Sequence, residues 1–297
     1  MQHSRKYRLS PFLKLIKHGI ILGNLVPVIA GFILALTPQN SSTISALLFA
    51  IIGTLFVIAS ATITNNIIDR DIDKVMRRTQ NRPLVNGDIS LACATVLALI
   101  FALLGFGILY LQVNILAGNI ALIGFIDYVI LYSLLFKRHS TLSILVGSIS
   151  GATPPLIGYV AASNQLSWDI LYLFIIFASW QIAHSYAIAM YREQDYSAAN
   201  IPMPSRFFSL KMNQRRVVGD ILLMLIATIF LVWQSFNFII LQLLTVIFIT
   251  SWLLSAIKPI HIAPERWGKK QFINSLGIIM GLCALIMIDH GLPLLFA

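Results

Sequence analysis

Charge is scarce in this chain. Only 11% of its 297 residues are Asp, Glu, Lys or Arg, and the acids number 11. A soluble domain needs charged side chains to cover its core, and no long polar segment supplies them, so we exclude a separate soluble domain. With 58% hydrophobic residues and a mean hydropathy of +0.85, the composition is typical of a polytopic membrane protein.

Cysteine is nearly absent as well. The two cysteines, Cys93 and Cys283, both lie within apolar stretches and far apart in the sequence. A disulfide framework or a cysteine-ligated zinc site needs more cysteines at short spacings. Both kinds of site are therefore excluded.

Long apolar runs, in contrast, fill the chain. A bilayer-spanning helix needs about 20 mainly apolar residues, and nine windows meet this need: 20–37, 45–65, 91–111, 115–136, 141–161, 169–190, 219–236, 238–257 and 273–291. The seventh and eighth are the least secure pair, because only a short polar stretch separates them. We predict an all-α membrane protein in which nine transmembrane helices form a bundle around a central cavity, capped by cytoplasmic loops. Residues 1–297 are expected to form one transmembrane domain.

The basic residues fall on one side of this topology. Five Lys or Arg precede the first window, five follow the second, two follow the fourth, five follow the sixth and four follow the eighth, which accounts for all 21. Basic residues accumulate in cytoplasmic loops. We therefore expect a multi-pass protein of the cell inner membrane with a cytoplasmic N-terminus. The net charge of +10 needs no nucleic acid partner, because the lipid bilayer and its positive-inside rule explain it.

A first polar cluster follows the second window. It reads Asn65-Asn66-Ile-Ile-Asp69-Arg70-Asp71-Ile-Asp73 and is followed by Arg77, Arg78 and Arg82. At helical spacing Asn65, Asp69 and Asp73 share one face, whereas Asp71 points away. Mg²⁺ prefers such oxygen ligands and is usually held by one or two carboxylates together with substrate phosphates. The arginines can hold phosphate oxygens directly, so the cluster predicts a metal and phosphate site. A solvated helix end is the alternative.

A second polar cluster ends the sixth window. It contains Tyr191, Arg192, Glu193, Asp195 and Tyr196. Two acidic clusters at the same membrane face are what a two-metal diphosphate site requires, because bridging ions neutralise the charge of the leaving group. We predict Asp195 as the carboxylate of the second cluster, with a solvated loop acid as the alternative.

These clusters resemble the UbiA superfamily of intramembrane prenyltransferases, whose first acidic motif is Asn-x-x-x-Asp-x-x-x-Asp. The resemblance covers residues 14–204 and runs closer to the haem-farnesylating branch. The matching segments are Lys17-x-Gly19-Ile20-Ile21-x-Gly23-Asn24, Asn65 to Pro83, Lys137-Arg138-His139-Ser140, 147–159, Trp180-Gln181-x-x-His184-Ser185-Tyr186 and Asp195-Tyr196. The superfamily usually has a second aspartate-rich motif. Here that segment reads Tyr191-Arg192-x-x-Asp195-Tyr196, which leaves the ligands of any second metal open.

The resemblance implies transfer of a farnesyl group from farnesyl diphosphate to a vinyl group of haem b, giving haem O and diphosphate, with Mg²⁺ as the cofactor. It assigns Mg²⁺ binding to Asn65, Asp69 and Asp73, with Asn65 or Asn66 positioning the carboxylates, and Asp195 assists as a further catalytic and metal-binding residue. The implied residues for phosphate oxygens or haem propionates are Arg78, Arg82, Lys137 and Arg138. The other substrate-binding candidates are Asn24, Asn65, Asn66, His184, Tyr191, Arg192 and Tyr196. A downstream haem-modifying enzyme or oxidase assembly is the implied protein partner.

Polar side chains inside apolar windows are costly and usually functional, and we single out His184, Asn24 and Asp127. His184 has three candidate roles: a haem contact, a general base, or a helix-to-helix hydrogen bond. Asn24 faces a similar choice, with a packing contact as the simpler option. Asp127 must face the cavity or pair internally, and the sequence shows no partner for it.

Two rival functions stay open. A relative of the same superfamily could prenylate an aromatic acid or a chlorin. A secondary transporter would place acids near the bilayer midplane, often on broken helices. Asp127 and the prolines Pro154 and Pro155 favour a transporter, whereas the acidic clusters at one surface argue against it. We expect the small residues around these prolines to serve helix packing rather than ligand contact.

Overall fold

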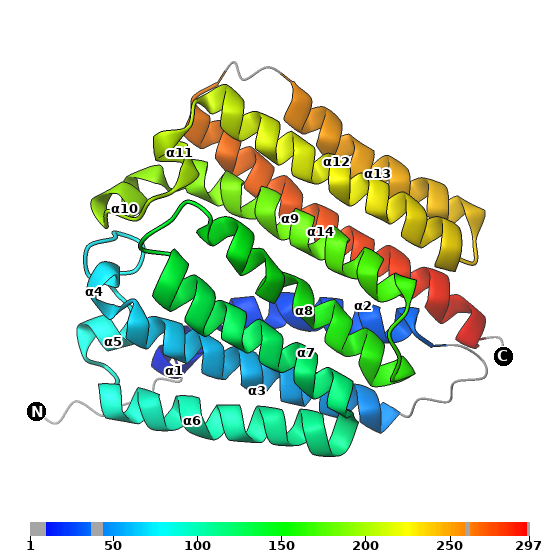
Figure 1. The fold of residues 1–297 in the computed structure, drawn as a ribbon, viewed down its shortest axis with the longest axis horizontal. Helices are drawn as coiled ribbons and strands as arrows, with labels where there is room; N and C mark the ends of the chain where they lie inside the picture. The colour runs from blue at the N-terminus through cyan, green and yellow to red at the C-terminus, as the bar shows by residue number, and fades with distance from the viewer. Residues whose placement is uncertain (1–9, 37–43, 259–261, 296–297) are drawn as a thin grey trace, which may run out of the picture.

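The structure is a computed structural model that describes residues 10–36, 44–258 and 262–295. Within these residues eight helices are long and apolar enough to cross a membrane, and α2 is a shorter apolar helix of 17 residues. In chain order they are α2 (His18–Leu34), α3 (Ile44–Ile68), α6 (Leu91–Ile108) with η1 (Leu109–Val113), α7 (Ile115–Ile126) with η2 (Asp127–Phe136), α8 (Ser143–Ser163), α9 (Trp168–Tyr191), α12 (Leu210–Ser235), α13 (Ile239–Ile257) and α14 (Pro264–Leu295). Each predicted window overlaps one of these helices, so the all-α bundle is confirmed (Figure 1).

Some helix ends differ from the predicted windows. α12 begins at Leu210 instead of 219, and α14 begins at Pro264 instead of 273. Their first turns carry basic residues, which a hydropathy window rejects although the helix continues through them. α12 and α13 are separate helices, because Phe236 and Phe238 between them have extended backbones. The end of the first window, residue 37, lies outside the described residues.

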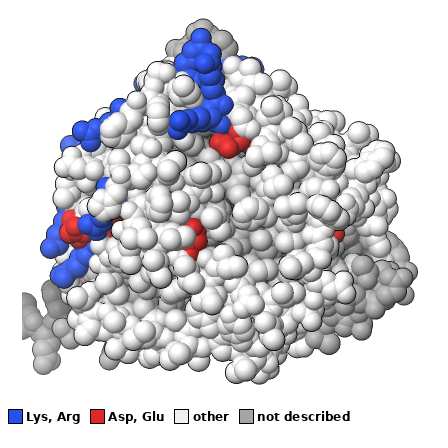
Figure 2. Space-filling view, viewed as in Figure 1, with Lys and Arg blue, Asp and Glu red and all other residues white. Residues whose placement is uncertain are grey.

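Short helices cover one end of the bundle. They are α1 (Ser10–Leu15), α4 (Arg70–Asp73), α5 (Pro83–Asn86), α10 (Glu193–Ala198) and α11 (Pro204–Phe207). In Figure 1 they gather along the left and upper-left edge, where the long helices end. Figure 2 shows the Lys and Arg side chains along the same edge, beside a surface with almost no charge. On the face that Figure 2 shows, the basic groups therefore cluster at one end of the bundle as predicted, whereas Arg5, Lys6 and Arg8 lie outside the described residues.

Polar side chains begin several of the long helices. Ser90 Oγ accepts a hydrogen bond from the Cys93 N–H ahead of α6, and Ser209 Oγ accepts one from the Met212 N–H at α12. Each bond satisfies a backbone donor that the first helical turn cannot pair. The apolar runs therefore become helices with defined starting points.

The central crossing of the bundle is a close contact between α2 and α8. A Cβ atom on Gly158 would lie 1.9 Å from the carbonyl oxygen of Val28, and one on Gly31 would lie 2.0 Å from that of Pro155. Only glycine permits this approach of two backbones. At Gly158 the small residues of α8 thus serve packing, as the sequence suggested.

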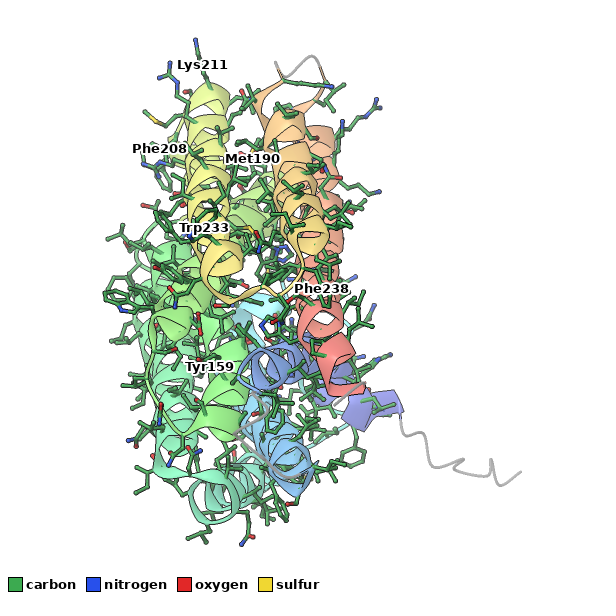
Figure 3. The ribbon with its side chains drawn as sticks, turned by 90° about the vertical axis from the view of Figure 1, so that its right-hand side faces the viewer. Tyr159, Met190, Phe208, Lys211, Trp233 and Phe238 are labelled. Atoms are coloured by element: carbon green, nitrogen blue, oxygen red, sulfur yellow. The ribbon has the colours of Figure 1, made fainter. Side chains whose placement is uncertain are left out.

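At the opposite end of the bundle, one carboxylate joins α14 to the turn between α12 and α13. Asp289 on α14 is buried and accepts hydrogen bonds from the backbone N–H groups of Asn237 (2.7 Å) and Phe238 (3.0 Å) in the turn between α12 and α13. Figure 3 is turned toward this end and shows Trp233 and Phe238 at the turn, with Lys211 at the other end of α12. The hydrogen bonds of Asp289 therefore stabilise the end of the bundle that lies opposite the short helices.

Candidate active site

The end of α3 carries the predicted metal-binding motif. Helical hydrogen bonds run from the Asp69 N–H to the Asn65 carbonyl (2.9 Å) and from the Asp73 N–H to the Asp69 carbonyl (2.8 Å). The three side chains therefore share one face, and none is more than 3% exposed. Asp71 points outward, with a side chain that is 66% exposed. The helix end thus turns two carboxylates and one amide inward.

Each buried carboxylate uses one oxygen and leaves the other without a partner. Asp69 Oδ2 accepts hydrogen bonds from Lys137 Nζ and from Asn65 Nδ2 (2.9 Å). Asp73 Oδ2 accepts one from Arg82 Nη1 at 2.5 Å. Within the described part of the chain, Asp69 Oδ1 and Asp73 Oδ1 are buried and make no hydrogen bond. Unpaired buried oxygens are costly and rare, so they mark a place for a ligand.

These oxygens fit the predicted Mg²⁺. Mg²⁺ takes oxygen ligands and is usually held by one or two carboxylates and by substrate phosphates. Asp69 and Asp73 can each supply one oxygen while keeping their bonds to Lys137 and Arg82. The described residues contain no group of three or more His, Cys, Asp or Glu side chains that could hold a metal. The arrangement therefore suits an ion that is also held by phosphate oxygens.

The two asparagines have different contacts. Asn65 Oδ1 accepts a hydrogen bond from Lys17 Nζ (2.6 Å), and its Nδ2 also donates to Ser133 Oγ (3.0 Å). Asn66 Nδ2 donates to the Leu15 carbonyl (2.8 Å) and so anchors α1 to α3. Of the two alternatives for positioning the carboxylates, Asn65 is the one that contacts Asp69.

Lys17 is a site residue to which the sequence assigned no binding role, although it begins one of the segments that resemble the family. It precedes α2 with φ of 51° and ψ of 54°, a left-handed backbone conformation that is uncommon for a residue with a side chain. Its ammonium group contacts Asn65 in the interior. Burial, together with the charges of Arg82 and Lys137, holds the pKa of Lys17 well below its ordinary value. A nearby anion would therefore favour its charged form.

The π-helix η2 faces this motif from the neighbouring span. Tyr128 and Tyr132 stack with ring centroids 5.7 Å apart, and Lys137 Nζ lies 5.8 Å from the centre of the Tyr132 ring. The Lys137 N–H bonds the Tyr132 carbonyl across the wide π turn (2.8 Å). π turns are rare and occur often at functional sites. Here the wide turn directs Lys137 toward α3.

The second predicted cluster lies at the end of α9 and on α10. The Arg192 guanidinium stacks on the Tyr191 ring, 4.1 Å from its centre. The Tyr196 phenol interacts electrostatically with Tyr132 and with Lys137, which shows that α10 approaches the first cluster. Desolvation raises the pKa of Tyr196. The structure therefore brings both clusters to one end of the bundle.

Asp195 is next to Tyr196 on α10 and is partly exposed. It does not join Asp69 and Asp73 as a third carboxylate in the described structure. Its role as a metal ligand stays a prediction.

The predicted phosphate-binding cations have different environments. Lys137 and Arg82 line the carboxylate pair, whereas Arg78 is exposed. Arg138 donates to both carboxylate oxygens of Asp71, at 2.7 Å each, and clamps the outer side of the helix end. These bonds lower the pKa of Asp71 to about 2. Lys137 and Arg82 are therefore better placed than Arg138 for a ligand on the carboxylates.

His184 lies deep in α9 in an aromatic setting. Its Nδ1 is 2.7 Å from Ser275 Oγ on α14, and its ring stacks on Trp180 with 4.9 Å between centroids. Phe272 lies 5.1 Å away on another side. The structure thus contains the helix-to-helix hydrogen bond, one of the three roles considered. The haem contact and the general base stay predictions.

Asn24 and Asp127, the other two polar groups predicted inside the spans, each make a local hydrogen bond. Asn24 Nδ2 donates to the Ile20 carbonyl one turn earlier (2.8 Å). Asp127 is 2% exposed, and its Oδ2 accepts a hydrogen bond from the Ser150 N–H on α8 (2.9 Å). Asp127 therefore pairs internally, with a partner that the sequence could not identify.

Known proteins are similar to this chain in sequence. The model of the UbiA prenyltransferase family matches residues 24–276. A protein named protoheme IX farnesyltransferase from Pectobacterium carotovorum is 40% identical over 285 residues, which cover 95% of each chain. One of the same name from Aliivibrio salmonicida is 47% identical over 192 residues, covering 65% of this chain and 66% of that one.

Solved structures have the same fold. Digeranylgeranylglyceryl phosphate synthase superimposes with a TM-score of 0.77 at 18% identity and covers 95% of this chain and 98% of its own. A UbiA homologue from Archaeoglobus fulgidus, bound to GPP and Mg²⁺, gives a TM-score of 0.70 at 17% identity, with coverage of 93% and 99%. The family match and the 40% identity overrule the transporter alternative. With its acidic motif at the polar end of α3, the chain belongs to the UbiA prenyltransferase family.

Proposed function

We propose that this protein transfers the farnesyl group of farnesyl diphosphate to a vinyl group of haem b, which gives haem O and diphosphate. The observation that carries the proposal is the pair of buried oxygens, Asp69 Oδ1 and Asp73 Oδ1, beside Lys17, Lys137 and Arg82. Two carboxylates among several cations suit a metal and a diphosphate together. Haem as the acceptor is supported by the relatives named protoheme IX farnesyltransferase.

The reaction needs a stabilised leaving group. The bond between C1 of the farnesyl chain and the diphosphate oxygen breaks, and both electrons leave with the diphosphate. The vinyl group attacks the allylic cation, and water then adds to the new cation on the porphyrin side and releases a proton. Lys17, Lys137 and Arg82 hold the diphosphate oxygens as charge builds up on them. Bound Mg²⁺ would supply further positive charge to the same group.

The two clusters have separate tasks in this proposal. Asp69 and Asp73, aligned by Asn65, would hold the metal, and Asp195 assists from α10. The second cluster, with Arg192 and the Tyr191 and Tyr196 rings, faces the acceptor. His184, stacked on Trp180, adds an aromatic surface that a flat macrocycle can contact. The apolar interior shelters the allylic cation from water.

The proposal includes the membrane setting. Residues 1–297 act as one domain in the cell inner membrane, and the N-terminus is cytoplasmic. The gathering of Lys and Arg at the end that carries the acidic motif supports this orientation (Figure 2). The product would pass to a downstream haem-modifying enzyme or oxidase.

A reconstituted assay tests the function. The purified full-length protein in lipid vesicles receives farnesyl diphosphate, Mg²⁺ and haem b, and both haem mass and released diphosphate are measured. We expect haem that has gained one farnesyl group and one hydroxyl group, with an equal amount of diphosphate. Asp69→Asn should lower this rate by about 10²–10³ while the protein stays folded.

Parallel reactions with other acceptors test the rival prenyltransferase. 4-Hydroxybenzoate and chlorophyllide replace haem b in otherwise identical mixtures. Prenylation of either one without modification of haem would overturn the assignment of the acceptor and keep the family. Absence of diphosphate release with every acceptor would overturn the assignment of the acidic motif as well.

A further inference from the structure

A hollow opens between α8, α9 and α12 at the polar end of the bundle, away from the acidic motif. Its volume is about 410 Å³. Apolar side chains at the start of α8 and on α9 form its walls, among them Leu142 just before α8 and Leu145 on it, which are each 55% exposed. Two charged side chains of α12, Arg216 and Asp220, line it as well. A lipid-facing hollow that combines apolar walls with one cation and one anion is suited to an amphipathic ligand.

The Arg216 guanidinium is held in place before any ligand arrives. Its Nη1 donates a hydrogen bond to the Tyr186 hydroxyl (2.8 Å), and its plane lies over the Phe208 ring, 4.0 Å from the ring centre. Phe208 lies beside the start of α12 in Figure 3. A guanidinium has five N–H donors in a fixed fork, so several remain for a phosphate. Preorganisation of this kind lowers the entropy cost of binding.

Asp220 supplies the opposite charge one turn further along α12. It interacts electrostatically with Arg216 and makes no hydrogen bond within the described residues. Four helical residues correspond to a rise of about 6 Å, so the two charged groups lie at slightly different depths. Gly219 between them leaves the floor open, because a Cβ atom there would meet nothing within 4 Å.

Arg216 and Asp220 lie where the basic first turns of α12 give way to its apolar part. The apolar part of α12 begins at about the position of Asp220, and the preceding turns carry basic residues. Arg216 therefore lies at the level of lipid headgroups, and the leucine walls of α8 lie beside acyl chains.

We propose that this hollow binds one phospholipid with an ethanolamine headgroup. Its phosphate would bind Arg216, its primary ammonium would donate hydrogen bonds to Asp220, and an acyl chain would cover Leu142 and Leu145. Charge complementarity selects this headgroup. A purely anionic lipid would meet the Asp220 carboxylate, and a choline headgroup has no N–H to donate. The bound lipid would fasten the loop before α12 to α8 and α9.

Native mass spectrometry of the purified full-length protein tests the proposal. The protein is stripped of lipid and then offered phosphatidylethanolamine, phosphatidylcholine or phosphatidylglycerol with identical acyl chains. Wild type should retain one phosphatidylethanolamine with at least about tenfold preference over each of the others, since a hydrogen bond to a charged group is worth about this factor. Equal retention of all three lipids would overturn the proposal.

Two variants locate the lipid. Gly219→Leu fills the hollow and removes no charged group, so retention should fall at least about tenfold. Gly277→Leu is the matched control, because Gly277 is also an exposed helix glycine whose added Cβ meets nothing within 4 Å. Asp220→Asn leaves the shape intact and should abolish the preference for ethanolamine over choline. Unchanged retention in Gly219→Leu, or unchanged preference in Asp220→Asn, would overturn the assignment.

Discussion

Replacing Lys137 with methionine removes the cation that neutralises Asp69. The Asp69 carboxylate is 1% exposed and the Lys137 side chain 9%. Removing one partner of such a buried pair leaves an uncompensated charge and typically costs about 3–5 kcal/mol. We expect Lys137→Met to lower the free energy of unfolding by this amount. Because Lys137 also holds the diphosphate in the proposed reaction, turnover should fall by about 10²–10³ as well.

Reversible unfolding in mixed detergent measures the first effect, and haem O formation in vesicles measures the second. The double variant Asp69→Asn with Lys137→Met removes both charges, so it should regain most of the stability but no activity. The Arg138–Asp71 pair provides the matched control on the outer side of the same helix end, with side chains 29% and 66% exposed. Arg138→Met should therefore change stability by at most about 1 kcal/mol.

If Lys137→Met and Arg138→Met changed stability equally, the Lys137–Asp69 pair would not be buried as described. If the double variant regained both stability and turnover, neither charged group would take part in the chemistry.

Four further outcomes follow from the structure. Gly158→Ala should lower the free energy of unfolding by about 3 kcal/mol or more, because its Cβ would overlap the Val28 carbonyl; Gly219→Ala, in open space, should not. Asp289→Ala removes the buried carboxylate that accepts two backbone hydrogen bonds from the turn, and it should cost about 2 kcal/mol in the same unfolding assay, because hydrogen bonds to charged groups are worth about 1.5–3 kcal/mol each. Arg138 lowers the pKa of Asp71 from 3.8 to about 2, so this pair stabilises the protein above about pH 4 and loses that contribution as the pH falls toward 2. Asp71→Asn should remove this part of the loss of stability in acid. An unchanged profile of stability against pH in this variant would contradict the role of the pair. Chelation of divalent cations should stop diphosphate release and added Mg²⁺ should restore it, whereas release that survives chelation would exclude a metal.

The architecture could be predicted from the sequence because two strong signals agree. Apolar runs of membrane-spanning length give the helices, and the placement of Lys and Arg gives their common polar end. The shared face of Asn65, Asp69 and Asp73 also follows from helical geometry alone. These features depend on spacing along the chain, which a single sequence contains.

Contacts between distant segments could not be predicted in this way. The sequence did not show that Arg138 bonds Asp71 or that Asn66 bonds the Leu15 carbonyl of α1, and the predicted binding roles of both residues stay predictions. Lys17 enters the site through one left-handed backbone conformation, and Lys137 reaches Asp69 from the end of a π-helix. Neither conformation has a reliable signal in hydropathy or spacing, so the residues that complete the site became visible only in three dimensions.

The central claim is that Asp69 and Asp73 hold a divalent ion together with the diphosphate of the prenyl donor. Electron paramagnetic resonance with Mn²⁺ in place of Mg²⁺, and with an unreactive farnesyl thiolodiphosphate, tests it most directly. Wild-type protein should bind Mn²⁺ with phosphorus couplings from the analogue, and the folded variant with Asp69→Asn and Asp73→Asn should show neither. Identical spectra from both proteins would contradict the account.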